Sequence, residues 1–74
     1  MKAQLQIGNE LREGEVDTPY FYISTGRVYE WEFEYASGDI DTMYSNKLFS
    51  RPELALEHFR SIGGVIIQEE GKPA

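Results

Sequence analysis

The acidic side chains that could do chemistry in this chain stand at alternating positions. Glu30, Glu32 and Glu34 are separated by single aromatic residues within Arg27–Tyr35, which reads RVYEWEFEY. Successive side chains of a β-strand point to opposite faces, so the run predicts a strand with carboxylates on one face and aromatic rings on the other. Carboxylates at every second position lie roughly 6.8 Å apart, a spacing similar to that of a run of phosphates.

Three interpretations of this carboxylate row stay open. It is a solvated surface, a surface that docks on a basic protein with tyrosines as aromatic anchors, or a weak divalent-cation site built from Asp39, Asp41 and Glu34. We favour the docking surface as the functional hypothesis and expect no metal. The candidate partner-binding residues are Glu30, Glu32, Glu34, Asp41, Tyr20, Tyr22 and Tyr44.

Other catalytic chemistry has little support in the sequence. General acid–base catalysis by two carboxylates needs a cleft that separates their pKa values, and an exposed sheet in 74 residues offers little concavity. His58 is the one histidine and falls in the middle of a predicted helix, where we expect it on the helix flank. The serines lack a nucleophile-elbow context, and the glycines mark turns rather than a phosphate-binding loop. We therefore expect neither an enzyme nor a bound cofactor.

Composition narrows the class of partner. Thirteen acidic residues against seven basic ones give a net charge of -6. This charge argues against direct nucleic-acid binding, which needs clustered Lys and Arg, and allows association with a basic protein surface. The same charge would also serve solubility alone. The chain has no Cys and no long apolar run, so we expect a cytoplasmic protein that makes no disulfide and does not enter a membrane.

The length predicts one small domain over residues 1–74. Residues 8–18 are polar and glycine-punctuated and predict a loop, while residues 69–74 predict a frayed tail. Alternating or short apolar runs predict strands at Lys2–Ile7, Tyr20–Ser24, Arg27–Tyr35, Ile40–Asn46 and Val65–Gln68.

A helix is predicted between the fourth and fifth of these strands. Ser50 and Glu53 stand in the capping-box relation, with Pro52 tolerated in the first turn. Gly63-Gly64 supplies the stop. Apolar side chains recur at helical spacing at Leu54, Ala55, Phe59 and Ile62.

The element order β-β-β-β-α-β predicts an α+β domain. We expect an antiparallel sheet of four to five strands with one helix packed on one face. The helix would lie over a core formed by Tyr29, Trp31, Phe33, Phe59 and Ile62.

Turn chemistry predicts the strand registers. A three-residue turn at Ser24–Gly26 pairs Phe21 with Tyr29, and a two-residue turn at Ser37–Gly38 sets the last of the three glutamates opposite Asp41. The face away from the helix would then carry the carboxylates with tyrosines interleaved. Like charges directly across strands are unfavourable, so a sheet selected only for stability would alternate Lys and Glu there. The arrangement therefore favours a function for this face.

The segment from Tyr20 to Ile62 resembles the YegP-like family of small domains of unknown function. The residues that carry the resemblance are Trp31-Glu32-Phe33, Ser37-Gly38-Asp39, Tyr44-Ser45 and Phe49-Ser50-Arg51, followed by Ala55. The resemblance implies a β-sheet with one helix and pairing between copies, and it implies no activity. Family strands place Arg or Lys between the aromatic residues where this chain has Glu, and the family often carries the unit twice.

Two functional hypotheses follow. The first is a non-enzymatic acidic domain that docks on a basic partner. A phage-type inhibitor that mimics nucleic acid and binds a nucleic-acid-binding protein is the class of protein that this hypothesis predicts. The second is a structural homo-oligomer, such as a homodimer, that pairs through strand edges or tyrosines.

Overall fold

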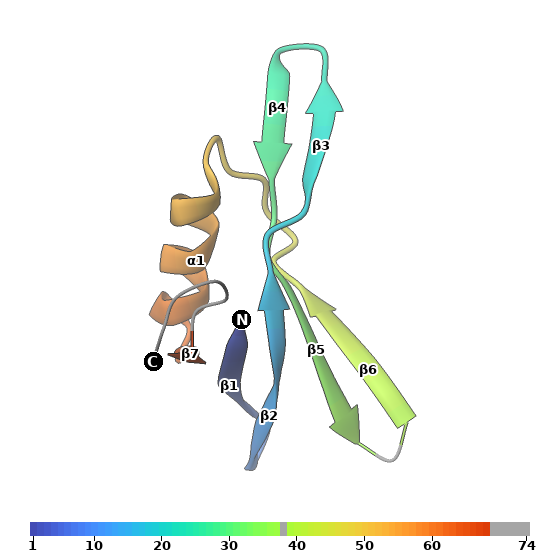
Figure 1. Ribbon diagram of the computed structural model, residues 1–74, viewed down its shortest axis with the longest axis vertical. Helices are drawn as coiled ribbons and strands as arrows, with labels where there is room; N and C mark the ends of the chain where they lie inside the picture. Colours follow the sequence, from blue (N-terminus) through green and yellow to red (C-terminus); the bar gives the residue numbers. More distant parts are fainter. Residues whose placement is uncertain (38, 69–74) are drawn as a thin grey trace.

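The computed structural model describes residues 1–37 and 39–68 (Figure 1). The predicted tail at 69–74 lies outside the described residues. The elements in chain order are β1 Lys2–Ile7, β2 Glu10–Asp17, β3 Tyr20–Ile23, β4 Gly26–Tyr29, β5 Glu32–Ser37, β6 Asp39–Tyr44, α1 Pro52–Ser61 and β7 Val65–Gln68.

The strands form two antiparallel sheets. A five-stranded sheet has the order β6-β5-β2-β1-β7, and β3 and β4 form a separate two-stranded sheet. Figure 1 shows β3 and β4 projecting beyond the larger sheet, while α1 lies to one side of it. The predicted α+β class, with an antiparallel sheet and one helix, is confirmed.

The prediction of a loop at residues 8–18 is wrong, because most of this segment is the central strand β2. Lys2 of β1 pairs with Glu15, and Val16 pairs with Phe33 of β5. Val16 is the only large apolar side chain of β2 that is fully buried. With a single buried apolar side chain and a solvated opposite face, the strand has the composition of a loop.

The predicted strand Arg27–Tyr35 is broken between β4 and β5. Asp17 pairs with Glu32 and Tyr20 with Tyr29, so the pairing register of β2 with β5 continues unshifted into β3 with β4. The break falls at Pro19, whose carbonyl accepts the N–H of Glu30 at 3.1 Å but whose own nitrogen has no hydrogen to donate back. The two strand pairs are therefore one long hairpin interrupted at a proline.

Both predicted turn registers are wrong by one residue. Ile23 pairs with Gly26, which leaves a two-residue turn and sets Phe21 opposite Val28. Gly26 has φ 128°, a conformation that strongly favours glycine. The register is inherited from the β2–β5 pairing, which the buried pair Val16–Phe33 fixes; local turn preference does not decide it.

The β5–β6 register is likewise set by packing. Glu34 lies opposite Thr42, and Asp41 lies opposite Tyr35. This register pairs Phe33 with Met43 and lets Met43 pack against the core. The predicted register would have placed Thr42 opposite Phe33.

The core lies between the sheet and α1. Trp31 and Phe33 contact Phe59 of the helix, with ring centroids 5.2 and 5.7 Å apart. These predicted core residues are confirmed, whereas Ile62 is 46% exposed and Tyr29 is only half-buried. The fully buried hydrophobic side chains are Ala3, Leu5, Val16, Trp31, Phe33, Ala55 and Phe59.

The helix begins one residue later than the capping box predicts. Arg51 is the N-cap residue, with extended backbone angles of φ -143° and ψ 150° and no side-chain cap hydrogen bond. A residue before proline is pushed out of the helical region, so Pro52 excludes Arg51 from the helix and displaces Ser50 from the capping position. The predicted stop is confirmed, because Gly63 adopts φ 102° directly after the helix.

Candidate protein-binding surface

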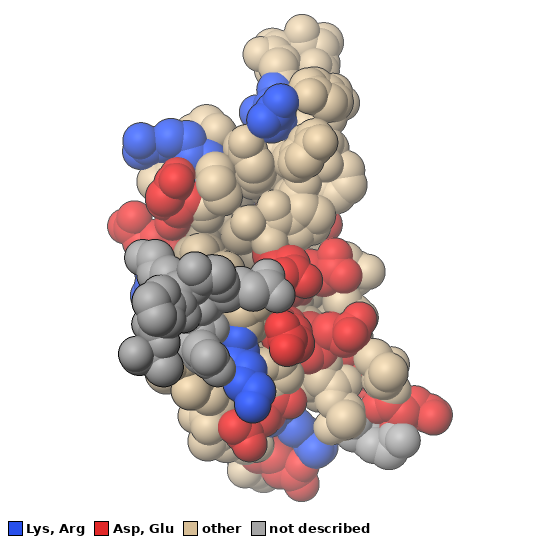
Figure 2. Space-filling model, viewed as in Figure 1, with Lys and Arg blue, Asp and Glu red and all other residues tan. Residues whose placement is uncertain are grey.

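The sheet face away from the core carries carboxylates from two neighbouring strands. Val16 and Phe33 face the core as a cross-strand pair, so the residues on either side of each point the other way. We define the acidic face as Glu13, Glu15 and Asp17 of β2 together with Glu32 and Glu34 of β5. Figure 2 shows acidic side chains gathered over the middle of the molecule, where Figure 1 places β2 and β5.

Carboxylates oppose one another directly on this face. Glu15 pairs with Glu34, and Asp17 pairs with Glu32. Side chains at such positions have Cβ atoms about 4.5–5.5 Å apart, and like charges there are destabilising. Some compensation comes from the terminal ammonium of Met1, which lies 3.4 Å from Oε2 of Glu15 and 4.0 Å from Oδ1 of Asp17. Lys2 of β1 also pairs with Glu15 and offsets part of the charge on that side, whereas β5 supplies only carboxylates to the two pairs.

The sequence identified part of this face. The predicted residues Glu32 and Glu34 lie on it. The predicted anchor Tyr44 lies beside it, because Tyr44 pairs with Glu32 and is 48% exposed. The predicted placement of Asp41 is wrong, because Asp41 pairs with Tyr35 on the helix side of the sheet.

Three of the five carboxylates were missed because their strand was predicted as a loop. The signal that could have found them is the alternation E-G-E-V-D in residues 13–17, which repeats the carboxylate spacing of β5. Glu30, a predicted member, is half-buried and lies in the break between β4 and β5.

The predicted anchors Tyr20 and Tyr22 lie elsewhere, on the projecting hairpin. We define the arm as residues 20–29, comprising β3, β4 and their turn. The guanidinium carbon of Arg27 lies 4.8 Å from the Tyr20 ring centroid and 5.4 Å from that of Tyr22. Arg27 Nη2 also donates a hydrogen bond to the Tyr22 hydroxyl at 2.9 Å. Hydrogen bonding with Tyr29 and Tyr22 raises the pKa of Arg27 above its ordinary value.

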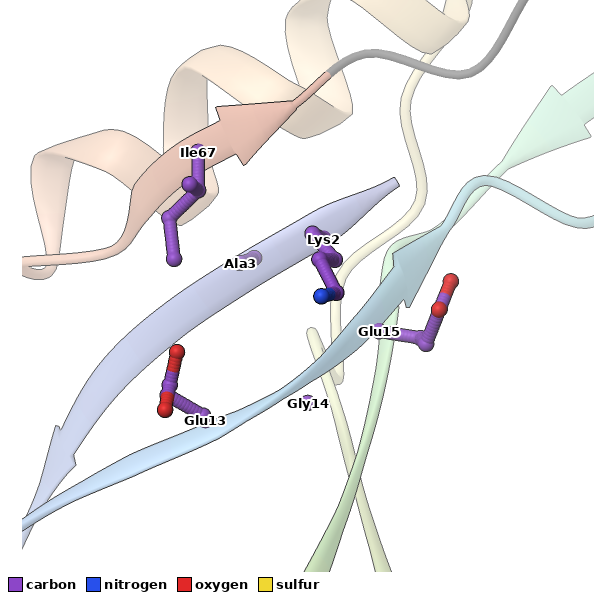
Figure 3. Close-up of a pocket in the computed structure, with 6 residues that line it drawn as sticks. All are labelled: Lys2, Ala3, Glu13, Gly14, Glu15 and Ile67. Carbon is purple, nitrogen blue, oxygen red and sulfur yellow. The ribbon is translucent and has the colours of Figure 1, made fainter.

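A shallow pocket of about 250 Å³ lies between β1, β2 and β7 (Figure 3). Its lining includes the charged side chains of Lys2, Glu13 and Glu15, with Ile67 on the opposite wall. Glu13 and Glu15 are exposed members of the acidic face. Their carboxylates can accept hydrogen bonds from a guanidinium or ammonium group of a partner.

His58 has a structural contact. The indole Nε1 of Trp31 donates a hydrogen bond to His58 Nδ1 at 3.0 Å, and the Phe49 ring centroid lies 5.4 Å from the imidazole. Trp31 is 1% exposed, so His58 satisfies the one polar group of a buried ring.

The residues proposed for a cation site are not assembled. Asp39 and Asp41 pair with Ser37 and Tyr35, whereas Glu34 is turned to the other side of the sheet. Within residues 1–37 and 39–68, no group of three or more His, Cys, Asp or Glu side chains could hold a metal ion. No helix in the described part of the chain is long and apolar enough to cross a membrane.

No family model matches the sequence, and comparisons with curated proteins and with solved structures find no match either. The resemblance to the YegP-like family stays a prediction.

Proposed function

We propose that this protein is a non-enzymatic binding domain whose acidic face docks on a basic protein surface. The observation that supports the proposal is the direct opposition of Glu15 to Glu34 and of Asp17 to Glu32. Each like-charge pair costs stability in the free protein. A partner that brings Lys or Arg side chains to the face relieves this repulsion on binding. Solubility requires net charge but does not require carboxylates at directly opposed positions, whereas binding to a basic surface accounts for both.

The spacing of the charges indicates the kind of basic surface. Carboxylates follow each strand at roughly 6.8 Å intervals, and the two strands lie about 4.8 Å apart. A two-row patch of this kind offers negative charge at intervals comparable to those of nucleic-acid phosphates. The partner class that it fits is a nucleic-acid-binding protein, and occupying that protein's basic site would inhibit it.

Two further features of the face fit a protein partner. Tyr44 lies beside Glu32 with about half of its side chain exposed, which offers an aromatic contact next to the charges. The pocket beside this face presents the carboxylates of Glu13 and Glu15 together with the ammonium group of Lys2, so it offers both hydrogen-bond acceptors and a donor to a partner. The face thus combines charges that steer association with local contacts, at Tyr44 and at the pocket, that would fix the orientation of the partner.

The test is capture of partners from a host lysate, followed by titration of the captured protein against purified variants. Glu32→Gln/Glu34→Gln removes two charges from the acidic face. Glu53→Gln/Glu57→Gln removes the same number from exposed positions of α1 and is the matched control. We expect the first variant to lose affinity for the captured protein and the control to keep it.

Salt provides the second readout. Affinity should fall at least about tenfold between low and physiological salt, because screening weakens interactions between exposed charges. Equal affinity of both double variants, or binding that is independent of salt, would contradict docking through the acidic face.

A further inference from the structure

The arm exposes large side chains to an unusual degree for a strand pair. Tyr20, Phe21, Tyr22 and Ile23 are 54%, 45%, 69% and 46% exposed, so the whole of β3 is uncovered. Figure 1 shows the arm extending away from the helix and the five-stranded sheet. The arm continues the β2–β5 hairpin and is tied to Phe49 at its base through Tyr29, but from Tyr20 to Val28 its two strands pair with no third described strand. Two strands without a third or a covering helix are at best marginally stable in water. The arm therefore has the exposure and the architecture of an element that is completed by something else.

The two faces of the arm differ. Cross-strand pairing puts Tyr20 and Tyr29 on one face, where the Tyr20 ring packs edge-on against Tyr22 at 5.8 Å and against Arg27. The opposite face carries only apolar side chains. They are Phe21, Ile23 and Val28.

One edge of the arm is available for pairing. The N–H and C=O of Tyr29 are both bonded to Phe49, at 2.8 and 2.7 Å, so they point away from β3. In an antiparallel ladder, Tyr20 opposite Tyr29 is then a non-hydrogen-bonded pair, and the backbone groups of Tyr20 and Tyr22 face the outer edge of β3. Among the described strands, none other than β4 pairs with β3. An open edge of this kind is a template for another strand.

Charge indicates which strand fits that edge. The chain carries a net charge of -6, yet residues 18–29 contain Arg27 and no Asp or Glu. Two copies that approach through their acidic faces repel one another, whereas two arms meet without opposing carboxylates. A strand edge is also self-complementary when the pairing is antiparallel about a two-fold axis.

We propose that the arm is a homodimerisation element that pairs β3 with β3 of a second copy. A two-fold axis at Phe21 makes the two Phe21 side chains neighbours and sets Tyr20 of one copy opposite Tyr22 of the other. The two arms then form one four-stranded antiparallel sheet. This proposal does not depend on the docking function, because it uses none of the acidic-face residues.

The size of the contact predicts a weak dimer. Aromatic side chains offer about 150–250 Å² each, and roughly half of each side chain on β3 is exposed. The surface available is therefore on the order of 400 Å² per copy, below the roughly 800 Å² of a standard interface. We expect reversible association that depends on protein concentration.

Sedimentation velocity over a concentration series tests the proposal on the full chain. The wild type should move from 8.5 kDa toward twice that mass as concentration rises. Phe21→Thr/Ile23→Thr keeps β-propensity while removing the apolar face, and should stay monomeric. Leu11→Thr/Ile40→Thr changes two exposed side chains of the other sheet and should dimerise like the wild type. A wild type that is monomeric throughout, or a dimer that persists in the arm variant, would overturn the proposal.

The absence of Cys from the chain allows a second measurement of the same contact. Phe21 would occupy a non-hydrogen-bonded pair across the axis, where Cα atoms lie about 4.5 Å apart and a disulfide can form. Phe21→Cys should give a covalent dimer with diamide as oxidant, whereas Ile40→Cys should give much less. Equal yields from the two variants would count against the arm contact.

Salt separates this proposal from the docking function. Screening reduces repulsion between two negatively charged copies, so dimerisation through the arm should persist or strengthen at high salt. Binding to a basic partner should weaken under the same conditions. Loss of one property therefore leaves the other measurable.

Discussion

Neutralising the acidic face should make the protein more stable. Glu32 and Glu34 each lie directly opposite a carboxylate of β2, so Glu32→Gln/Glu34→Gln removes two like-charge pairs. Each such pair costs a few tenths of a kcal/mol to about 1 kcal/mol. The free energy of unfolding should rise by about 0.4–2 kcal/mol if the pairs act independently.

Urea unfolding followed by the fluorescence of Trp31, the one tryptophan, measures this change. Small domains have m-values near 1 kcal/mol/M, so the midpoint should shift upward by roughly 0.4–2 M. The gain should shrink as salt is added, because screening already weakens the repulsion in the wild type. Glu53→Gln/Glu57→Gln makes the same change in net charge at α1, where it also removes the favourable interaction of Glu53 with the first turn of the helix.

The sign of the shift decides the interpretation. A double variant on β5 that is less stable than the wild type would show that these carboxylates make favourable interactions in the free protein. The repulsion argument for a binding face would then fail. A gain equal to that of the α1 control would assign the effect to net charge rather than to the paired positions.

Two further substitutions test the packing that positions the face. His58→Phe should lower the free energy of unfolding by about 1–3 kcal/mol, because it removes the acceptor of the buried Trp31 N–H; a variant as stable as the wild type in urea would contradict this role. Gly14→Ala would direct a methyl group into the backbone carbonyl of Glu34, so β2 and β5 must separate. We expect a loss of more than about 2 kcal/mol, measured as a lowered thermal midpoint, and an unchanged midpoint would show that the strands give way easily.

Local patterns in the sequence predicted the elements that have an apolar signature. Alternation predicted β1 and the aromatic core of β5, a short apolar run predicted β7, and the glycines marked the end of α1. The sequence pattern did not predict strand β2, because Val16 is its only fully buried large side chain. Whether that side chain is buried depends on partners distant in sequence. The helix start was misplaced because the backbone constraint of Pro52 outweighed the capping preference of Ser50.

The candidate site was predicted only in part for a related reason. The alternation of β5 locates Glu32 and Glu34, but the neighbours across the sheet follow from register. Register was decided by the buried pair Val16–Phe33 and by the packing of the partly buried Met43 beside Phe33, rather than by the turns. A shift of one residue exchanges the two faces of a strand. The predicted residue Asp41 therefore lies on the helix side, whereas the predicted anchor Tyr44 lies beside the acidic face.

The interruption at Pro19 explains how one hairpin can support two surfaces. On the β2–β5 side of Pro19, the core covers one face of the two strands. The carboxylates on the other face are therefore held by strands that cannot separate without exposing Val16 and Phe33. On the arm side of Pro19 the same register continues without a core, and there we propose that β3 pairs with a second copy. A dimer joined through two arms leaves both acidic faces accessible. Such a dimer would engage a partner bearing two basic sites with higher avidity than a monomer, because the second contact forms intramolecularly.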